Sequence, residues 1–461
     1  MPSRRLNTLA SGGLFVALGI SLCSRAQADS VATDWPQFRG SQASGVSAQA
    51  ETPTHWDVET GNNILWQTEI PGMGHSAPII WRDRIYVTTA VSEGDPDLSI
   101  VKGAGAAATA DDSGPQQWRL LAIDKATGKI VFDELGLVGV PRVKRHRKAS
   151  HCNSTPATDG THIVALFASE GLFCFDMEGR LQWKKDLGSL DSGHFSNPSS
   201  QWGFGSSPVI HDGKVVVLCD VQEGSFLAVF DLDEGEEFWR TPREDVPTWT
   251  TPTIVEHEGR TQILVNGWHH TGAYDFETGE EIWKLDGGGD IPVPTPIVAY
   301  GNAYFTSAHG SYRPVRAIRL GAKGDITPPE IEDTNDAIAW VHHKMGNYMQ
   351  TPIIVGDNLY LNYDYGILSC FDARTGEVQY RERLNARAVG YTASPVSDGK
   401  HLYFPSEDGL VVVVPASGEF SVVTINDLRE NCLATPAITD GMLIFRTQHK
   451  LIAVKEHVAA R

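Results

Sequence analysis

Aromatic, amide and imidazole side chains gather in the short segments that precede eight prolines of the chain. These groups suit a flat or sugar-like ligand, because rings stack on it and polar groups hydrogen-bond to it. A second interpretation stays open, in which the rings only fill a wide central channel. The candidate ligand-binding residues are His75, His151, Asn153, Trp202, Phe204, Trp249, Asn347, Tyr348, Tyr391 and Asn431.

A basic run, RVKRHRK, spans residues 142–148 of an otherwise acidic chain. Guanidinium and ammonium groups could hold a carboxylate or sulfate, which makes Arg145, Arg147 and Lys148 candidate anion-binding residues. Two alternatives stay open: the run pairs with acidic loops of its own chain, or it is a solvated loop.

Neither a metal site nor a catalytic site is predicted. The pairs His269-His270 and His342-His343 each offer at most one ligand to a given site, because adjacent strand residues point to opposite faces. No G-x-S-x-G, HExxH or phosphate-binding glycine loop occurs, so no residue is assigned a catalytic role.

The candidate site residues must be positioned by a repeated unit, of which residues 205–243 are the clearest copy. This segment has a Ser-Pro start, short apolar runs of strand formers, a turn at Asp212-Gly213, and Trp239 four residues after Gly235. Turn signals every eight to twelve residues indicate about four antiparallel strands. A single such sheet leaves a face uncovered and needs copies of itself as neighbours.

The start of the unit recurs eight times, each time as a proline after Ala, Ser or Thr. Most spacings are roughly 40–56 residues, as expected of four-stranded propeller blades. The glycine turn with a bulky residue four places on recurs too, and in a stretched copy near Gly324 its bulky residue is expected to be Trp340. The anchor prolines are Pro78, Pro156, Pro208, Pro252, Pro296, Pro352, Pro395 and Pro436.

These copies predict an all-β chain: an eight-bladed β-propeller of four-stranded antiparallel blades over residues 62–457. The last copy, residues 434–454, has only three strand runs, whereas residues 64–68 form a lone outer strand. We therefore expect the N-terminal strand to complete the C-terminal blade, which removes exposed sheet edges. A closed ring of this kind is expected to be a monomer.

The turn sequences AIDKATGKIVF, VFDLDEGEEFW, AYDFETGEEIW and CFDARTGEVQY resemble the repeats of pyrroloquinoline-quinone (PQQ) propellers. DWPQFRG and ILWQTEIPG also resemble the amino-terminal segment of that superfamily, and the likeness runs from Asp34 to Val454. The chain is similar as well to secreted PQQ-like repeat proteins of planctomycete-type bacteria. The resemblance implies the fold more strongly than a function.

Two functions follow from the resemblance. The superfamily includes BamB, a scaffold in outer-membrane protein assembly without a cofactor, and quinoprotein dehydrogenases, which use PQQ with calcium. The dehydrogenases characteristically carry adjacent cysteines, which this sequence lacks, and no haem-attachment CxxCH occurs. We therefore favour a non-catalytic protein without a cofactor that binds a protein or saccharide partner. A PQQ-dependent alcohol or sugar dehydrogenase is the alternative, and a purely structural propeller is a third.

Composition and the first residues suggest the compartment. The 461 residues carry a net charge of −19, which disfavours binding to nucleic acid. Residues 1–28 read as a cleaved export signal, with Arg4-Arg5, an apolar run too short to span a bilayer, and Ala26-Gln27-Ala28. We expect a periplasmic or secreted protein, an extended arm over residues 29–61, and surface insertions at 92–117 and 325–339.

Overall fold

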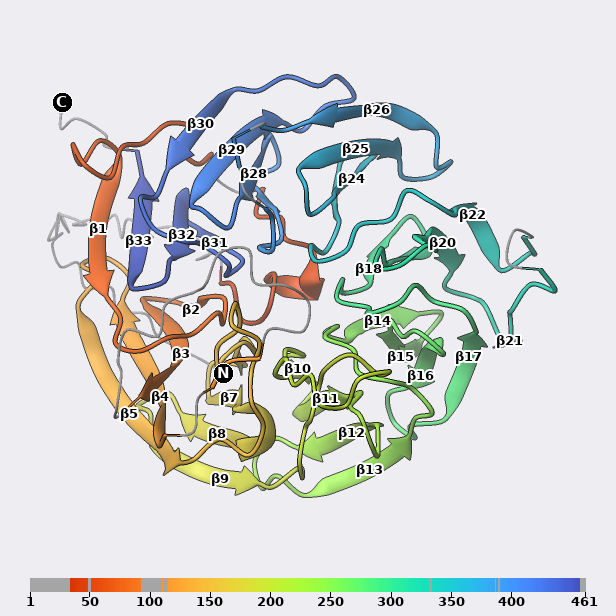
Figure 1. Ribbon diagram of the computed structural model, residues 1–461, viewed down its shortest axis with the longest axis horizontal. Helices are drawn as coiled ribbons and strands as arrows, with labels where there is room; N and C mark the ends of the chain where they lie inside the picture. Colours follow the sequence, from red (N-terminus) through yellow and green to blue (C-terminus); the bar gives the residue numbers. More distant parts are fainter. Residues whose placement is uncertain are drawn as a thin grey trace, which may run out of the picture. The chain divides into compact units, whose positions relative to one another are not determined.

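The computed structural model describes residues 34–48, 51–92, 109–111, 114–330, 334–385, 387–388 and 390–456. The expected export signal, residues 1–28, lies outside the described residues, as do most of the insertion at 92–117 and residues 331–333 of the insertion at 325–339. In the described part, strands in eight sheets stand around a central axis (Figure 1). The predicted eight-bladed propeller is confirmed.

Each blade is named here by its order along the ring, and its strands run from the inner to the outer edge. Blade 1 consists of β2(Ile79–Trp81), β3(Arg84–Ser92), β4(Gln116–Asp124) and β5(Ile130–Gly139), and blade 2 of β6(Ala157–Thr158), β7(His162–Leu166), β8(Leu172–Asp176) and β9(Leu181–Lys185). Blade 3 consists of β10(Val209–His211), β11(Lys214–Cys219), β12(Phe226–Asp231) and β13(Glu237–Pro242). Blade 4 consists of β14(Thr253–His257), β15(Arg260–Val265), β16(Thr271–Asp275) and β17(Glu281–Leu285).

Blades 5 to 8 follow the same plan. Blade 5 consists of β18(Ile297–Ala299), β19(Asn302–Thr306), β20(Val315–Arg319) and β22(Ile338–His342), and blade 6 of β23(Ile353–Val355), β24(Asn358–Asn362), β25(Ile367–Asp372) and β26(Val378–Arg383). Blade 7 consists of β27(Val396–Ser397), β28(His401–Pro405), β29(Leu410–Pro415) and β30(Thr424–Asp427). Blade 8 consists of β31(Ala437–Thr439), β32(Met442–Arg446), β33(Lys450–Lys455) and β1(Ile64–Glu69). Only two short 3-10 turns, η1(Ser41–Ala43) and η2(Ala168–Glu170), occur in the described chain.

The ring closes as the sequence predicts. Strand β1 pairs antiparallel with β33, from Ile64 opposite Val454 to Glu69 opposite Lys450. The insertion after blade 5's third strand adds one feature, since β21(Gly324–Asp325) pairs in parallel with β17 of blade 4. Trp340 lies in the outer strand β22, where the stretched repeat places it.

The repeated turn and the bulky residue are parts of one contact between neighbouring blades. Asp275 Oδ1 accepts the backbone N–H of Thr278 at 2.9 Å, and Gly279 takes φ +72. The ring of Trp239, from the previous blade, lies against this turn, and its Nε1 donates to the carbonyl of Phe276 at 3.1 Å. The same packing joins Trp66 to Gly128, Phe132 to Gly179, Trp183 to Gly235 and Trp340 to Gly376.

The residues before the anchor prolines link neighbouring blades in order from blade 1 to blade 8 around the central channel. The backbone N–H of Ser207 donates to Thr251 Oγ1 at 3.0 Å, and that of Thr251 donates to Thr295 Oγ1 at 3.3 Å. This ring of hydroxyls explains why Ser and Thr recur before the prolines. The equivalent bonds run from Ala77 to Thr155, Thr155 to Ser207, Thr295 to Thr351, Thr351 to Ser394, and Ser394 to Thr435.

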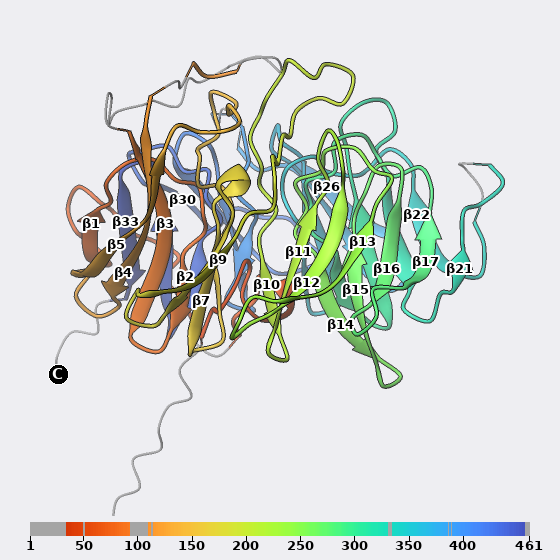
Figure 2. The same cartoon turned by 90° about the horizontal axis from the view of Figure 1, so that it is seen from below.

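The chain before blade 1 crosses one end of the channel (Figure 2). Trp35 pairs with Ile80 on the inner strand of blade 1. Further along, the guanidinium of Arg39 is fully buried and donates to the carbonyls of Pro352 at 2.8 Å and Pro395 at 2.7 Å. Arg39 thus fastens residues 34–48 to the inner strands of blades 6 and 7.

Candidate functional site

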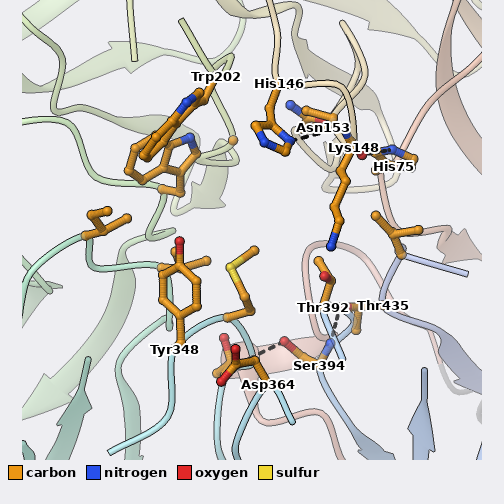
Figure 3. A pocket seen from close by; sticks show the side chains of 18 of the residues that line it. His75, His146, Lys148, Asn153, Trp202, Tyr348, Asp364, Thr392, Ser394 and Thr435 are labelled. Carbon is orange, nitrogen blue, oxygen red and sulfur yellow. Dashed lines mark hydrogen bonds between the residues drawn. The ribbon is translucent and has the colours of Figure 1, made fainter. Parts of the chain in front are cut away.

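A cavity of about 610 Å³ occupies the central channel, and Figure 3 shows part of its lining. The hydroxyl ring surrounds it, and Phe38 from the N-terminal segment contributes to its lining. Its remaining walls come from two sets of loops: those that lead into the inner strands, and the hairpins between the second and third strands of the blades. Because these loops meet at one end, residues far apart in the sequence face the same space.

The structure brings together about half of the residues that the sequence suggested. Six of the candidates line the cavity: His75, Lys148, Asn153, Trp202, Trp249 and Tyr348.

The other candidates do not line the cavity, because neighbouring residues of a loop point in different directions. Phe204 packs in the core between blades 2 and 3, and Tyr391 is buried between blades 6 and 7. Three more make contacts within the protein: His151 meets Trp118 edge-on, Asn347 bonds the Gln350 carbonyl, and Asn431 bonds Gln448.

The basic run is divided in the same way. Arg145 is buried and donates to the backbone carbonyl of Ala149 at 2.7 Å, whereas Arg147 is exposed and lies outside the cavity lining. Of the three candidate anion-binding residues, Lys148 alone lines the cavity, where its ammonium meets an acidic side chain of this chain. The basic run therefore does not form a joint anion site on the cavity.

One wall of the cavity is aromatic. The rings of Trp202 and Trp249 lie 5.8 Å apart between centroids and are tilted by 31°. Trp249 is held by a bond from its Nε1 to the carbonyl of Gly203 at 2.7 Å. Tyr348 continues the wall, with its ring 5.2 Å from that of His309. Together these rings offer faces on which a flat or ring-shaped ligand can stack.

The opposite wall is polar. Lys148 Nζ donates to Glu407 Oε2 at 2.8 Å, and Thr392 Oγ1 donates to Glu407 Oε1 at 2.8 Å. Asp364 adds a second carboxylate on the cavity. Burial raises the pKa of Asp364 to about 6, and the nearby charge of Glu407 acts in the same direction.

The imidazole of His75 behaves as a neutral hydrogen-bonding group. Burial lowers its pKa to about 3, helped by the positive charge of Arg446. Because a carbonyl only accepts, Nε2–H of His75 donates to the backbone oxygen of Lys148 at 2.9 Å. His75 thereby positions the main chain of Lys148 on the cavity wall.

Several lining residues escaped the sequence analysis, which considered only the segments before the prolines. His309, Asp364 and Glu407 come from hairpins between second and third strands, each one or two residues before a glycine. An alignment of the repeat copies could have indicated these residues, because the hairpins between second and third strands meet at the same end of the channel as the segments before the prolines. His146 lies within the basic run and was treated there only as part of a charged loop.

The comparisons with known proteins bear on this architecture. The family model described as "Outer membrane protein assembly factor BamB" matches residues 38–284 and 107–382. The chain belongs to this BamB family. A comparison with curated proteins found no match.

Solved structures of other proteins share the propeller fold. BamB from Moraxella catarrhalis is 15% identical, with a TM-score of 0.57 over 86% of this chain and 100% of its own. A europium-containing methanol dehydrogenase is 12% identical, with a TM-score of 0.57 over 91% of this chain and 90% of its own. The quinohemoprotein alcohol dehydrogenase from Comamonas testosteroni is 11% identical, with a TM-score of 0.56 over 93% of this chain and 82% of its own. At these identities the likeness concerns the fold.

The cavity of this BamB-family chain suits PQQ poorly. PQQ is a flat quinone that carries carboxylate groups, so its site needs uncompensated positive charge. Among the described lining residues, Lys148 is the one lysine or arginine, and it is already paired with Glu407. Asp364 adds negative charge, and no cluster of His, Cys, Asp or Glu suited to a metal ion occurs in the described residues.

No helix of the described chain is long and apolar enough to cross a bilayer.

Proposed function

We propose that this protein is a non-catalytic, exported binding protein whose channel cavity holds a saccharide. The observation that carries the proposal is the opposition of two walls in one cavity, with Trp202 and Trp249 on one side and the Lys148–Glu407–Thr392 group on the other. A pyranose has apolar C–H faces and polar edges, and it meets both walls at once.

Size and enclosure support the same ligand class. A volume of about 610 Å³ is within the range of pockets that take small ligands, and it exceeds the space of one water molecule many times. One end of the channel is closed by the segment that Arg39 fastens, so a ligand enters from the loop end. A long saccharide would place a terminal unit in the cavity and extend outwards past the loops.

The compartment and a protein partner form part of the proposal. The export signal read in residues 1–28 supports a periplasmic or secreted location. The description of the family as an outer-membrane assembly factor supports a protein partner in the envelope, for which the loops around the cavity are available.

Binding to a panel of soluble oligosaccharides, measured by isothermal titration calorimetry on the mature protein, tests the proposal. We expect saturable binding by at least one saccharide class, and a loss of about tenfold or more in affinity for Trp202→Ala, because the stacking face is removed. Phe238→Ala is the matched control, since Phe238 is an exposed aromatic residue of β13 outside the cavity lining. Equal losses for the two variants, or no saccharide binding at all, would reject the cavity as a saccharide site.

The dehydrogenase alternative makes the opposite prediction. A PQQ-dependent enzyme would bind PQQ with calcium and reduce a dye in the presence of an alcohol or sugar. The absence of adjacent cysteines and the charge of the lining favour the binding protein over this alternative.

A further inference from the structure

One carboxylate oxygen among the lining residues lacks a hydrogen-bond partner. Asp364 lies in the hairpin between β24 and β25, and its backbone carbonyl accepts the N–H of Tyr391 at 3.0 Å, which fixes the turn. Its Oδ1 is buried and has no hydrogen-bond partner among the described residues. Leaving a buried carboxylate oxygen without a donor is costly, so the carboxylate of Asp364, which lines the cavity, would be stabilised by a donor or cation that a ligand brings.

The other charged groups around Asp364 are already engaged. The ammonium of Lys148 bonds Glu407 at 2.8 Å, and the Nδ1 of His309 lies 3.0 Å from Asp290 Oδ2. The Lys148–Glu407 pair carries no net charge, so the uncompensated charge of the lining is the negative charge of Asp364. A cationic ligand would neutralise it, whereas a neutral ligand would leave it buried.

The rings next to Asp364 also favour a cation. Figure 3 shows Asp364 and Tyr348 on the same side of the cavity. Tyr363 and Tyr365 flank Asp364 in the sequence, line the cavity, and lie 5.6 Å apart between ring centroids. Arg313 already lies 5.8 Å from the centroid of the Tyr363 ring, so Tyr365 and Tyr348 are the rings that a ligand cation would meet. Aromatic faces attract ammonium groups, and the attraction adds to that of the carboxylate.

We propose that the saccharide bound in the cavity carries a free amine, with its ammonium donating to the carboxylate of Asp364 and its sugar ring stacked on the Trp202–Trp249 wall. This inference rests on the proposed function and narrows it from saccharides in general to amino sugars with an unsubstituted amine. An N-acetylated sugar fits less well, because its amide brings a donor without the charge.

The pH dependence of binding follows from the charges that face Asp364. Burial, and after it the charge of Glu407 from the β28–β29 hairpin, raise the pKa of its carboxyl to about 6, against a hydrogen bond from its own backbone N–H and the charges of His309 and Lys148. The carboxylate, which binds the ammonium, is formed as pH rises through about 6. Affinity for an amino sugar therefore increases through that range and then levels off until the amine itself loses its proton.

The test is calorimetric titration of the mature protein at about pH 7 with four ligands: a glucosamine tetramer, an N-acetylglucosamine tetramer, cellotetraose and spermidine. We expect the glucosamine tetramer to bind about tenfold or more tightly than the other three. Asp364→Asn should remove this preference, since the amide keeps the shape and loses the charge. Asp357→Asn should retain it, because Asp357 is an exposed carboxylate at the other end of blade 6.

Each alternative result has a separate meaning. Equal binding of the three saccharides, or a preference that survives Asp364→Asn, would overturn the amine assignment and leave the saccharide site standing. Spermidine binding as tight as that of the glucosamine tetramer would assign the site to amines alone and overturn the sugar. If none of the saccharides binds, the proposed function itself fails. Titrating the unaltered protein at about pH 5 as well gives a test without any variant, with weaker amino-sugar binding expected.

Discussion

Lys148 and Glu407 form an ion pair of 2.8 Å across the mouth of the cavity, although 259 positions separate them in the sequence. Lys148 lies in the loop between β5 of blade 1 and β6 of blade 2, and Glu407 lies in the β28–β29 hairpin of blade 7. The pair therefore connects the loop after blade 1 with blade 7, which blade 8 separates in the closed ring. Among the described lining residues Lys148 is the one lysine or arginine, and because Glu407 compensates its charge, it offers no free positive charge to an anionic ligand.

Replacing Lys148 with methionine should strengthen the binding of a cationic ligand several-fold. The change leaves Glu407 unneutralised and makes the cavity more negative. Calorimetry with the glucosamine tetramer checks this, with Lys144→Met as the control, because Lys144 forms an exposed pair with Asp111 outside the lining. Weaker binding in Lys148→Met than in the control would show that the ammonium itself contacts the ligand.

Glycine is required in the repeated turn for two reasons: its φ is positive, and the tryptophan ring of the neighbouring blade lies against it. Two glycine-to-alanine variants separate these effects. Gly279 has φ +72, and a Cβ there would lie 2.5 Å from Cε3 of Trp239. Gly213 has φ +68, with open space around it. Gly213→Ala should cost about 1 kcal/mol from backbone strain alone, and Gly279→Ala about 2 kcal/mol more from the clash. Urea denaturation measures both, and equal losses would contradict the inter-blade contact.

Removing the ring that fills this contact should be severe. Trp239→Ala or Trp283→Ala should cost on the order of 3–5 kcal/mol of unfolding free energy, because each leaves a cavity between or within blades. Trp239 additionally loses its bond to the Phe276 carbonyl. Chemical denaturation with a loss below about 1 kcal/mol would reject the structural role of these rings.

The hydroxyl ring makes a separate prediction. Thr251→Val keeps the shape of the side chain and removes the acceptor for the N–H of Ser207, which should cost about 1–3 kcal/mol. Thr251→Ser should recover most of that loss, since Ser207 and Ser394 serve in the same way elsewhere in the ring. If valine and serine variants unfold at the same denaturant concentration, the hydroxyl bonds contribute nothing measurable.

Asp364 should lower the folding stability of the ligand-free protein at neutral pH. Its folded pKa of about 6 exceeds the ordinary value of 3.8, so the folded state binds more protons between those values. Stability from this group is therefore lost as pH rises from about 4 to about 6 and stays low above it. Asp364→Asn should raise the melting temperature at about pH 7 and leave it nearly unchanged at about pH 4. A pH-independent difference between the proteins would contradict this account.

The fold could be predicted from the sequence because the same local sequence signals recur from blade to blade. Every anchor proline immediately precedes an inner strand, and turns such as Asp275 to Gly279 mark the outer hairpins. These signals are local, so one chain displays them several times. Closure of the ring by residues 64–69 could be predicted because the last copy of the repeat lacks an outer strand, and these residues form an outer strand without a blade of their own.

The cavity could be predicted only in part, because its lining depends on which way each loop residue points. Trp202 and Phe204 are two positions apart, yet Trp202 lines the cavity and Phe204 packs in the core. Asp364 and Glu407 belong to hairpins whose meeting point follows from the ring geometry, not from local spacing. Arg39 is a further case, since its carbonyl partners at Pro352 and Pro395 lie more than 300 positions away.

The most direct measurement compares two ligands on one sample of the mature protein by calorimetry, a glucosamine tetramer and PQQ with calcium ions. The account predicts saturable binding of the amino sugar that weakens below about pH 6, and no saturable binding of PQQ. Tight binding of PQQ together with dye reduction in the presence of an alcohol, and no binding of the amino sugar, would contradict it and identify a dehydrogenase.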